Sequence, residues 1–278
     1  MTGDLAAVPL RDEIHVWTAQ LDSGPAGRLA AFEVLSPEEL DRAGRYRFEH
    51  DRRRFIVARA ALRYLLAGYL GRDPGSLRLV SGPRGKPQLA PGVTGWLRFN
   101  SSRSESLAVF AVGRDRELGV DVERVRTDMD FEPLVDRVLS EAERGALDQL
   151  APEARRRAFY RCWTRKEAYL KALGVGLAVA PHELDVTGDH VKPLIRGQLR
   201  GLLEPDSTWS LHDVDLCPGY VAALAVEDDL LGPPEIRGSI LRVPDCRTGS
   251  VPNRGDIREN RGWPYGLVKG DYQLCVRT

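Results

Sequence analysis

The chain has 278 residues, enough for one large domain or two small ones with hydrophobic cores of their own. Hydrophobic residues make up 42% of it and charged residues 29%, as is typical of a soluble globular protein. The 40 Lys and Arg residues balance the 40 Asp and Glu residues, so no net charge attracts the chain to nucleic acid or to an anionic membrane. We therefore predict neither kind of partner.

The sequence also lacks export and membrane signals. No apolar run approaches the ~20 residues that a membrane-spanning helix needs, and residues 1–11 lack the basic start and apolar stretch of a signal peptide. We expect a cytoplasmic protein with reduced thiols, because its cysteines are scattered and no close pair is typical of a metal or redox site. Cys162 lies in an apolar stretch and is interpreted as a buried small residue rather than a nucleophile. The four cysteines are Cys162, Cys217, Cys246 and Cys275.

Two stretches carry apolar residues at helical spacing, which predicts two long amphipathic helices. The first runs from about residue 50 to 70 and the second from about residue 152 to 173. Gly71 and Gly174 follow directly, and glycine commonly ends a helix. Short apolar runs bounded by turn residues predict strands at 14–17, 107–112, 118–122 and 220–226.

The order of strand, helix and strands occurs twice. Residues 13–70 set against 117–174 give 11 identities in 58 ungapped positions, a shift of 104. We predict an α+β fold, a pseudo-dimer of two similar halves, each with a long helix packed on a small, mostly antiparallel sheet. A pseudo-dimer carries its second copy in cis, so we expect a monomer. The expected parts are an N-terminal half (1–115), a C-terminal half (116–230) and a flexible tail rich in Gly, Pro and Arg (231–278).

Two acids lie in the predicted strand Gly119-Val120-Asp121-Val122-Glu123. Residues two apart on a strand point to the same side, so both carboxylates face one way. Like charges held that close repel unless a cation lies between them. Hard oxygen ligands favour magnesium, manganese or calcium over zinc. For this pentapeptide alone, a solvent-facing strand edge is the simpler alternative.

A third acid, Glu167, lies at the border of the apolar stripe of the second long helix, and Lys171 follows one turn later. For these two residues alone, an ordinary Glu–Lys pair worth about 0.2–0.5 kcal/mol is the simpler alternative.

The three acids belong to the second half only. Their counterparts in the shifted first half are Trp17, Ala19 and Arg63. Decorative surface acids have no reason to be lost together, so this asymmetry favours a shared role.

Basic and hydroxyl residues gather in the first half. Arginines at 42, 45, 47 and 52–54 crowd the start of the first long helix. Arg84-Gly85-Lys86-Pro87 predicts a turn with a projecting lysine, and Asn100-Ser101-Ser102-Arg103-Ser104 predicts a polar loop before a strand. Such groups suit phosphate oxygens, although each could equally be solvated surface.

Gly-Val-Asp-Val-Glu, followed about forty residues later by Trp-Thr-Arg-Lys-Glu-Ala-Tyr-Leu-Lys, closely resembles the paired motifs of the 4′-phosphopantetheinyl transferases. The length, the two halves and the Arg-Gly-Lys-Pro and Phe-Asn-Ser-Ser-Arg-Ser segments resemble the surfactin-type (Sfp-type) branch. The match covers residues 10–228, and the motif pair in this order and spacing is specific.

The resemblance implies that Asp121, Glu123 and Glu167 bind a metal, Mg²⁺ or alternatively Mn²⁺, beside the pyrophosphate of coenzyme A. It implies that Glu167 or a metal-bound water takes the proton of the incoming serine. Lys171 would contact the pyrophosphate and help the leaving group. Asp121, Glu167 and Lys171 are thus the expected catalytic residues.

The resemblance also implies positions that bind coenzyme A, and one acid, Glu143, near the metal site. The expected coenzyme A-binding residues are Arg54, Lys86, Ser102, Arg103 and Lys171, with Arg42 a weaker match.

The implied activity transfers phosphopantetheine from coenzyme A to a serine of an apo acyl or peptidyl carrier protein and releases adenosine 3′,5′-bisphosphate. Fatty-acid, polyketide, nonribosomal-peptide and lysine-pathway carriers all fit. The carrier is expected to dock near residues 138–150 and the second long helix. The alternatives are a coenzyme A-binding relative without transfer activity and a metal-dependent phosphohydrolase that uses the same acids.

Three positions depart from the pattern of that family. Arg103 stands where histidine is usual, and arginine binds phosphate without switching its charge near neutral pH. Glu39 stands where a phosphate-binding lysine is common, with Arg42 close by. Val175 replaces the lysine of a Gly-Lys-Gly-Leu segment, which removes a cation near the expected carrier-binding side.

Overall fold

The computed structural model describes residues 9–22, 31–82, 85–176, 179–188, 190–191, 208–228, 234–241 and 276–277. The elements up to residue 114 are β1 (Glu13–Gln20), α2 (Pro37–Gly44), α3 (Glu49–Leu70), β2 (Leu79–Ser81), β3 (Pro87–Leu89), β4 (Leu97–Ser104) and β5 (Leu107–Arg114). Those that follow are β6 (Leu118–Arg124), α4 (Glu132–Val138), α5 (Glu141–Asp148), α6 (Pro152–Leu173), η3 (Pro181–Glu183), β7 (His190–Val191), β8 (Trp209–Val214), β9 (Tyr220–Glu227), β10 (Glu235–Ile240) and β11 (Val276–Arg277).

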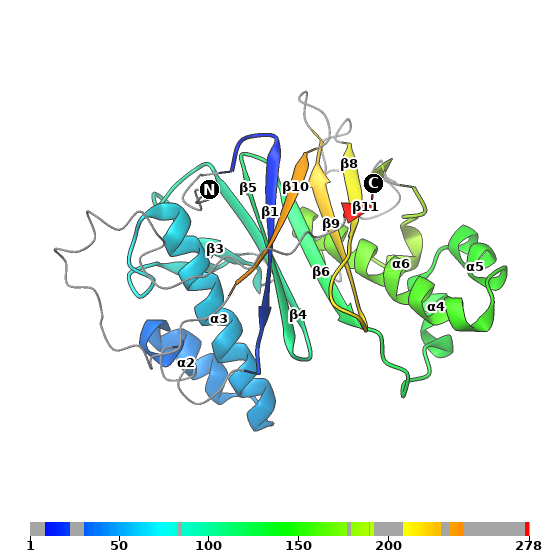
Figure 1. The fold of residues 1–278 in the computed structure, drawn as a ribbon, viewed down its shortest axis with the longest axis horizontal. Coiled ribbons are helices and arrows are strands. Elements are labelled where there is room, and N and C mark those ends of the chain that lie inside the picture. Colours follow the sequence, from blue (N-terminus) through cyan, green and yellow to red (C-terminus); the bar gives the residue numbers. More distant parts are fainter. Residues whose placement is uncertain are drawn as a thin grey trace, which may run out of the picture.

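The two long helices flank two sheets, as Figure 1 shows, with α3 on one side and α6 on the other. One sheet has the strand order β10-β1-β5-β4, and the other has the order β11-β8-β9-β6 with β7 beside β8. In each sheet, the first strand of that half pairs antiparallel with the last strand of the same repeat. These pairs are β1 with β5 and β6 with β9. The predicted α+β fold with two similar halves is confirmed.

The repeat is visible in local detail as well. Ser36 begins α2 and Ser140 begins α5, and each accepts a hydrogen bond from the backbone of a glutamate three residues later. The side chain of that glutamate in turn accepts a hydrogen bond from the backbone N–H of the serine, which completes a capping box. Both long helices end at a glycine in the left-handed conformation, Gly71 with φ 61° and Gly174 with φ 65°.

The faces of the central strands explain their unbroken apolar runs. On β5, Ala108, Phe110 and Val112 pack toward α3, whereas Leu107 and Val109 face the second sheet. Strands buried on both faces lose the alternation of polar and apolar residues. The inner faces of both sheets therefore form one shared core between the halves, with Val120 and Val122 of β6 in it.

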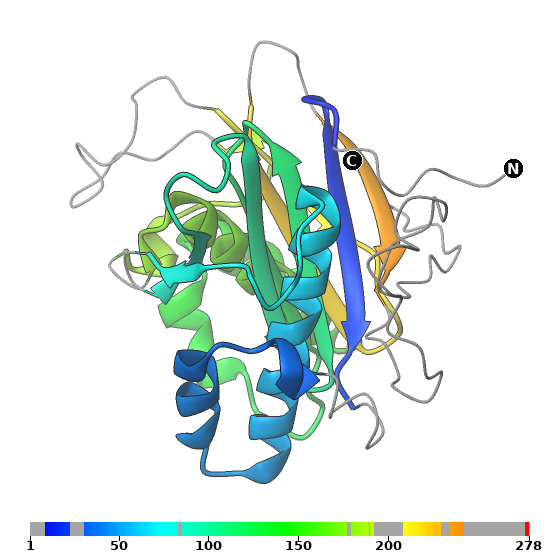
Figure 2. The same ribbon diagram turned by 90° about the vertical axis from the view of Figure 1, so that its left-hand side faces the viewer.

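Part of the expected tail is structured, so the prediction of a flexible tail is wrong for residues 235–240. This segment forms β10, which pairs parallel with β1 over six residues; Figure 2 shows it beside β1 at the sheet edge. Ile236 packs against the shared core, and Leu241 is 2% exposed in the core under α3. Val276–Arg277 also pair, with β8. The sequence of the tail has little apolar periodicity, but an open strand edge supplies backbone partners to almost any sequence.

The repeat explains where β10 binds. Arg237 of β10 forms an ion pair with Glu13, and Arg98 of β4 forms one with Glu117, the counterpart of Glu13. The two acids at the start of β1 and β6 thus each meet an arginine from a neighbouring strand, although β10 pairs with β1 through the backbone and β4 belongs to a different sheet from β6. Among the described residues, no helix has both the length and the apolar character that crossing a membrane requires.

Candidate functional site

The site lies along the seam where β4 of the first half meets β6 of the second. The segment 100–104, expected to be a polar loop, belongs to β4 and pairs with β5 in continuous register. Asn100, Ser102 and Ser104 occupy alternate positions of this strand and all bond to β6. The prediction of a loop was wrong because these side chains are polar. They are polar because this end of β4 bonds to β6 instead of packing into a hydrophobic core.

Asp121 is the most buried of the three predicted cation ligands, at 3% exposure. Its Oδ1 atom accepts hydrogen bonds from Lys171 Nζ at 2.6 Å and from Ser102 Oγ at 2.7 Å. Its Oδ2 atom is buried and has no hydrogen-bond partner among the described residues. A buried carboxylate oxygen without a partner is costly, and a cation would satisfy it.

The other two acids are half-buried beside Asp121. Burial, reinforced by the charge of Asp121, raises the pKa of Glu123 to about 7. Burial and the same charge also raise the pKa of Glu167, while Lys171 opposes the shift. Two half-buried carboxylates whose pKa is raised by burial and by the neighbouring Asp121 are a favourable setting for a divalent cation.

The donor set fits a hard cation, because it offers oxygens only and one of them is buried and unsatisfied. Within the described ranges, however, no three His, Cys, Asp or Glu side chains are gathered closely enough to form a ready-made metal site.

Gly119 sets the distance between β6 and α6. A Cβ atom added there would lie 2.1 Å from Ala168 O and 2.4 Å from Ala172 N, which are backbone atoms of the helix. Only glycine lets the strand come this close, and this approach places Asp121 and Glu123 opposite Glu167 and Lys171.

We expect Gly119→Ala to lower the free energy of unfolding in urea by about 2–3 kcal/mol, because backbone must move to admit the methyl group. Gly145→Ala is the matched control: no atom lies within 4 Å of its added Cβ, and it is in α5. It should be neutral or stabilise by up to about 1 kcal/mol. Equal unfolding midpoints for the two variants would show that the strand and helix are not in tight contact.

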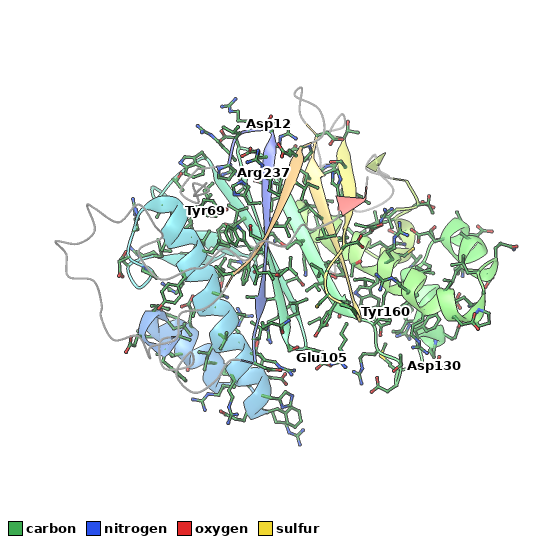
Figure 3. The ribbon with its side chains drawn as sticks, in the orientation of Figure 1. Asp12, Tyr69, Glu105, Asp130, Tyr160 and Arg237 are labelled. Atoms are coloured by element: carbon green, nitrogen blue, oxygen red, sulfur yellow. The ribbon has the colours of Figure 1, made fainter. Side chains whose placement is uncertain are left out.

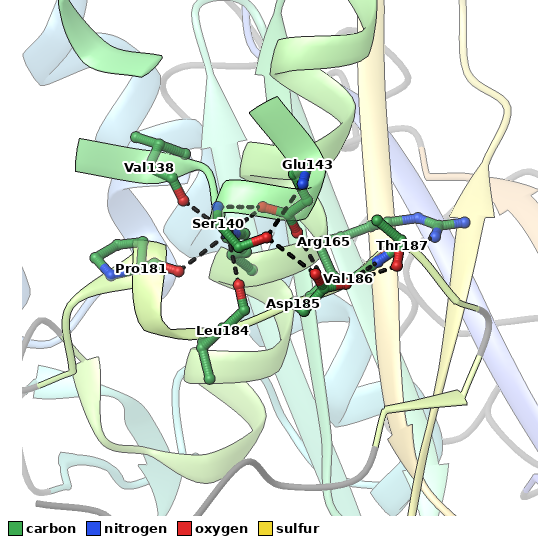
Figure 4. Close-up of polar contacts among 10 residues, drawn as sticks. Val138, Ser140, Glu143, Arg165, Pro181, Leu184, Asp185, Val186 and Thr187 are labelled. Atoms are coloured by element: carbon green, nitrogen blue, oxygen red, sulfur yellow. Dashed lines mark hydrogen bonds and ion pairs between the residues drawn. The ribbon is translucent and has the colours of Figure 1, made fainter. Parts of the chain in front are cut away.

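Glu143, expected near the metal site, has a supporting role instead. It caps α5, accepts a hydrogen bond from Val186 N at 2.8 Å, and forms an ion pair with Lys166. Lys166 also donates to the backbone oxygens of Val138, Pro181 and Leu184, as Figure 4 shows around its labelled partners. None of these contacts reaches the three acids directly, but they fix α6 at the residue before Glu167.

A basic pocket of about 190 Å³ opens on the first-half side of the seam, and Ser102 is in its lining. Three guanidinium groups lie over the ring of Phe55, those of Arg42 at 5.4 Å, Arg59 at 5.7 Å and Arg103 at 6.0 Å from its centroid. Arg103 also donates a hydrogen bond to Tyr46 Oη. The structure thus brings the predicted residues Arg42, Ser102 and Arg103 together.

The remaining predicted residues lie elsewhere on the seam. Lys86 Nζ is 3.5 Å from Leu118 O at the start of β6, and burial lowers its pKa. Arg54 forms ion pairs with Asp22 and with Glu105, which lies at the β4–β5 turn (Figure 3). Its guanidinium is therefore already neutralised by two carboxylates. Arg84 lies outside the described residues.

Cys162 behaves as expected of a residue that packs rather than reacts. It is half-buried against the cluster around Phe159, and burial raises the pKa of its thiol to about 11. Cys246 and Cys275 lie outside the described residues.

Sequence reasoning missed Gly119, Ser104 and Arg59. The signal for Ser104 was available, because Asn100, Ser102 and Ser104 alternate as strand residues do. Arg59 was hidden inside the apolar stripe of α3. The close approach at Gly119 depends on tertiary packing, which no local pattern reveals.

Comparisons with known proteins agree with this geometry. Residues 117–225 match the model of the 4′-phosphopantetheinyl transferase superfamily, and residues 23–114 match that of the 4′-phosphopantetheinyl transferase N-terminal region. The 4′-phosphopantetheinyl transferase HetI of a Nostoc species is 37% identical over 218 residues, 78% of this chain and 89% of its own length.

Two more distant similarities point the same way. A putative 4′-phosphopantetheinyl transferase of a Synechocystis species is 36% identical over 145 residues, 52% of this chain and 59% of its own length. The human L-aminoadipate-semialdehyde dehydrogenase-phosphopantetheinyl transferase is 28% identical over 249 residues, 83% of this chain and 74% of its own length. Because both halves match and the Nostoc relative is 37% identical over most of both chains, this protein belongs to the 4′-phosphopantetheinyl transferase superfamily.

Proposed function

We propose that this protein transfers 4′-phosphopantetheine from coenzyme A to a serine of an apo acyl or peptidyl carrier protein, in the manner of the surfactin-type branch. The observation that supports the site is Asp121, buried between the halves. One of its carboxylate oxygens is held by Lys171 and Ser102, and the other has no hydrogen-bond partner in the part of the chain that the structure describes. Glu123 and Glu167 lie beside it, and a basic pocket adjoins it.

Asp121, Glu123 and Glu167 would hold the cation, most simply Mg²⁺, with Mn²⁺ as a substitute. When bound, the cation would supply positive charge beside the pyrophosphate oxygens as the phosphoanhydride bond breaks. Asp121 is already prepared for this role, because two hydrogen bonds fix its carboxylate orientation.

The reaction needs a base for the carrier serine. The serine oxygen attacks the phosphorus atom that bears the pantetheine arm, and the bridging oxygen leaves with adenosine 3′,5′-bisphosphate. The side chain of Glu167 has no hydrogen bond or ion pair among the described residues, so a carboxylate oxygen that the cation does not take is open to the serine hydroxyl. It is therefore suited to accept the hydroxyl proton.

Lys171 and the basic pocket would handle the leaving group. Lys171 donates to Asp121 and to Ser102 from the last turn of α6, so its ammonium lies at the seam where negative charge builds up. Arg42, Arg59 and Arg103 would bind phosphate oxygens of the nucleotide, since arginine pairs well with phosphate and they lie in one pocket.

The carrier, the oligomeric state and the location remain parts of this proposal. Docking is proposed along residues 138–150 and α6, where exposed arginines already form ion pairs such as Arg144 with Asp136. A monomer is proposed because each half packs its sheet against the other. A cytoplasmic location, absence of membrane and nucleic-acid partners, and use of fatty-acid, polyketide or peptide carriers are proposed on sequence grounds.

The test is a mass measurement on a panel of apo carrier proteins incubated with the purified protein, coenzyme A and Mg²⁺. We expect at least one carrier to gain the mass of phosphopantetheine on its serine. Binding of coenzyme A by isothermal titration with no carrier modified would favour a relative without transfer activity. Release of phosphopantetheine to water in the absence of a carrier would favour a phosphohydrolase.

A further inference from the structure

Three uncharged polar side chains of strand β4 bond to strand β6 of the second half. Asn100 Oδ1 accepts from Val120 N at 3.0 Å, Ser102 donates to Asp121, and Ser104 Oγ donates to Glu123 Oε2 at 2.8 Å. The two sheets are thus joined at this seam through side chains. Both carboxylates on β6 are held, at least in part, by the other half of the chain.

The orientation of the Ser104 hydroxyl is fixed by two hydrogen bonds to β6. Its oxygen accepts a hydrogen bond from Arg124 N at 3.1 Å, the residue that follows Glu123. A hydroxyl has a single proton to donate. With the Arg124 amide on the oxygen, that proton is directed to Glu123 Oε2. Ser104 therefore bonds to the backbone of Arg124 and to the carboxylate of Glu123, which are neighbours on β6.

Glu123 depends on this contact more than Asp121 depends on Ser102. Asp121 is held by Lys171 of its own half as well as by Ser102. Among the described residues, Ser104 is the one hydrogen-bond donor to Glu123. A glutamate side chain loses considerable rotamer entropy when it is fixed, so without this donor Glu123 would sample several orientations.

We propose that Ser104 is a positioning residue that presets Glu123 for the cation, so that the first half determines the geometry of a ligand carried by the second. The inference rests on the proposed function, because it requires Glu123 to be a cation ligand. Groups that orient ligands from outside the coordination shell change metal affinity by about 10–100-fold when they are removed.

The experiment measures Mn²⁺ binding to the full chain in the presence of coenzyme A, from the electron paramagnetic resonance signal of free Mn²⁺. We expect Ser104→Ala to weaken binding by about 10–100-fold and Ser104→Thr, which keeps the hydroxyl, to restore it to within about threefold. The Mg²⁺ concentration for half-maximal transfer should rise with Ser104→Ala, while the rate at saturating Mg²⁺ should stay near that of the wild type.

Ser106→Ala is the matched control. Ser106 Oγ and Tyr220 Oη lie 3.2 Å apart, so this variant also removes a hydrogen bond between the halves, one whose partner is a phenol rather than a carboxylate. We expect both alanine variants to lower the unfolding midpoint in urea by similar amounts and only Ser104→Ala to weaken Mn²⁺ binding. If Ser104→Ala does not fold, Ser104→Cys, whose thiol is a weak donor, replaces it.

Equal Mn²⁺ affinity for the wild type, Ser104→Ala and Ser106→Ala would overturn the inference and leave the proposed function intact. Equal weakening by both alanine variants would also overturn it, because the effect would then come from the interface. A wild-type protein that transfers phosphopantetheine without binding Mn²⁺ or Mg²⁺ would overturn the cation assignment itself, and the inference with it.

Discussion

Replacing Asp121 with asparagine is expected to slow phosphopantetheine transfer by roughly a thousandfold, the scale at which one preorganised electrostatic group acts in an active site. The amide keeps the shape of the side chain but removes the charge that Lys171 and the cation both require. Its nitrogen would also meet either the ammonium of Lys171 or the cation, and both contacts are repulsive. The rate is measured by mass spectrometry of the carrier at saturating coenzyme A and Mg²⁺.

Asp128→Asn is the matched control for this change. Asp128 lies seven residues later in the loop after β6, and its carboxylate pairs with Arg126 in solvent. Its replacement should leave transfer within about twofold of the wild type, because exposed ion pairs contribute little. If Asp121→Asn, folded and binding coenzyme A, kept a tenth of the wild-type rate, the buried carboxylate would not be central to the chemistry.

The sequence predicted the elements whose signals are local. The long helices were located to within about a residue, because their apolar stripes and terminal glycines are visible in the chain. The apolar runs that became β5 and β9 were also predicted as strands. Strand β4 was missed because it ends in polar side chains, which bond to β6. Strand β10 was missed because it is stabilised by pairing with the edge of β1 rather than by an apolar pattern of its own.

The site was predictable in its residues more than in its arrangement. The two motifs identified Asp121, Glu123, Glu167 and Lys171, and the structure brings them together on β6 and α6. The partner of Glu143 could not be predicted, since only the fold shows that Lys166 meets it. Arg54 was expected to bind coenzyme A, but in the structure it pairs with Asp22 and Glu105. These partners lie 32 and 51 residues away in sequence, so no local pattern could predict the pairing.

The second large effect is expected on stability, from Lys166→Met. The side chain of Lys166 is 1% exposed, and its ammonium satisfies three backbone oxygens together with the fully buried carboxylate of Glu143. Methionine has a similar length but offers no donor, so those acceptors and a negative charge would stay buried without compensation. Breaking one side of a buried ion pair costs about 3–5 kcal/mol, and we expect a loss of that size in urea unfolding.

Arg161→Met on the same helix separates this effect from the loss of any ion pair. Arg161 pairs with Asp213, but its side chain is 55% exposed and Arg165 holds the same carboxylate, so a loss below about 1 kcal/mol is expected. Similar losses for the two variants would mean that the Lys166 cluster is not a buried support.

The position of Lys166 in the chain gives this stability effect a functional consequence. Consecutive residues of a helix point about 100° apart. Lys166 can therefore contact Val138, Glu143 and Pro181 while Glu167 lies beside Asp121 of β6. Fixing Lys166 fixes the rotation of α6 about its axis. The directions of Glu167 and of Lys171, one turn later, are then fixed as well. Lys166→Met at a temperature where it remains folded should therefore transfer phosphopantetheine more slowly than Arg161→Met does, although neither side chain contacts the three acids.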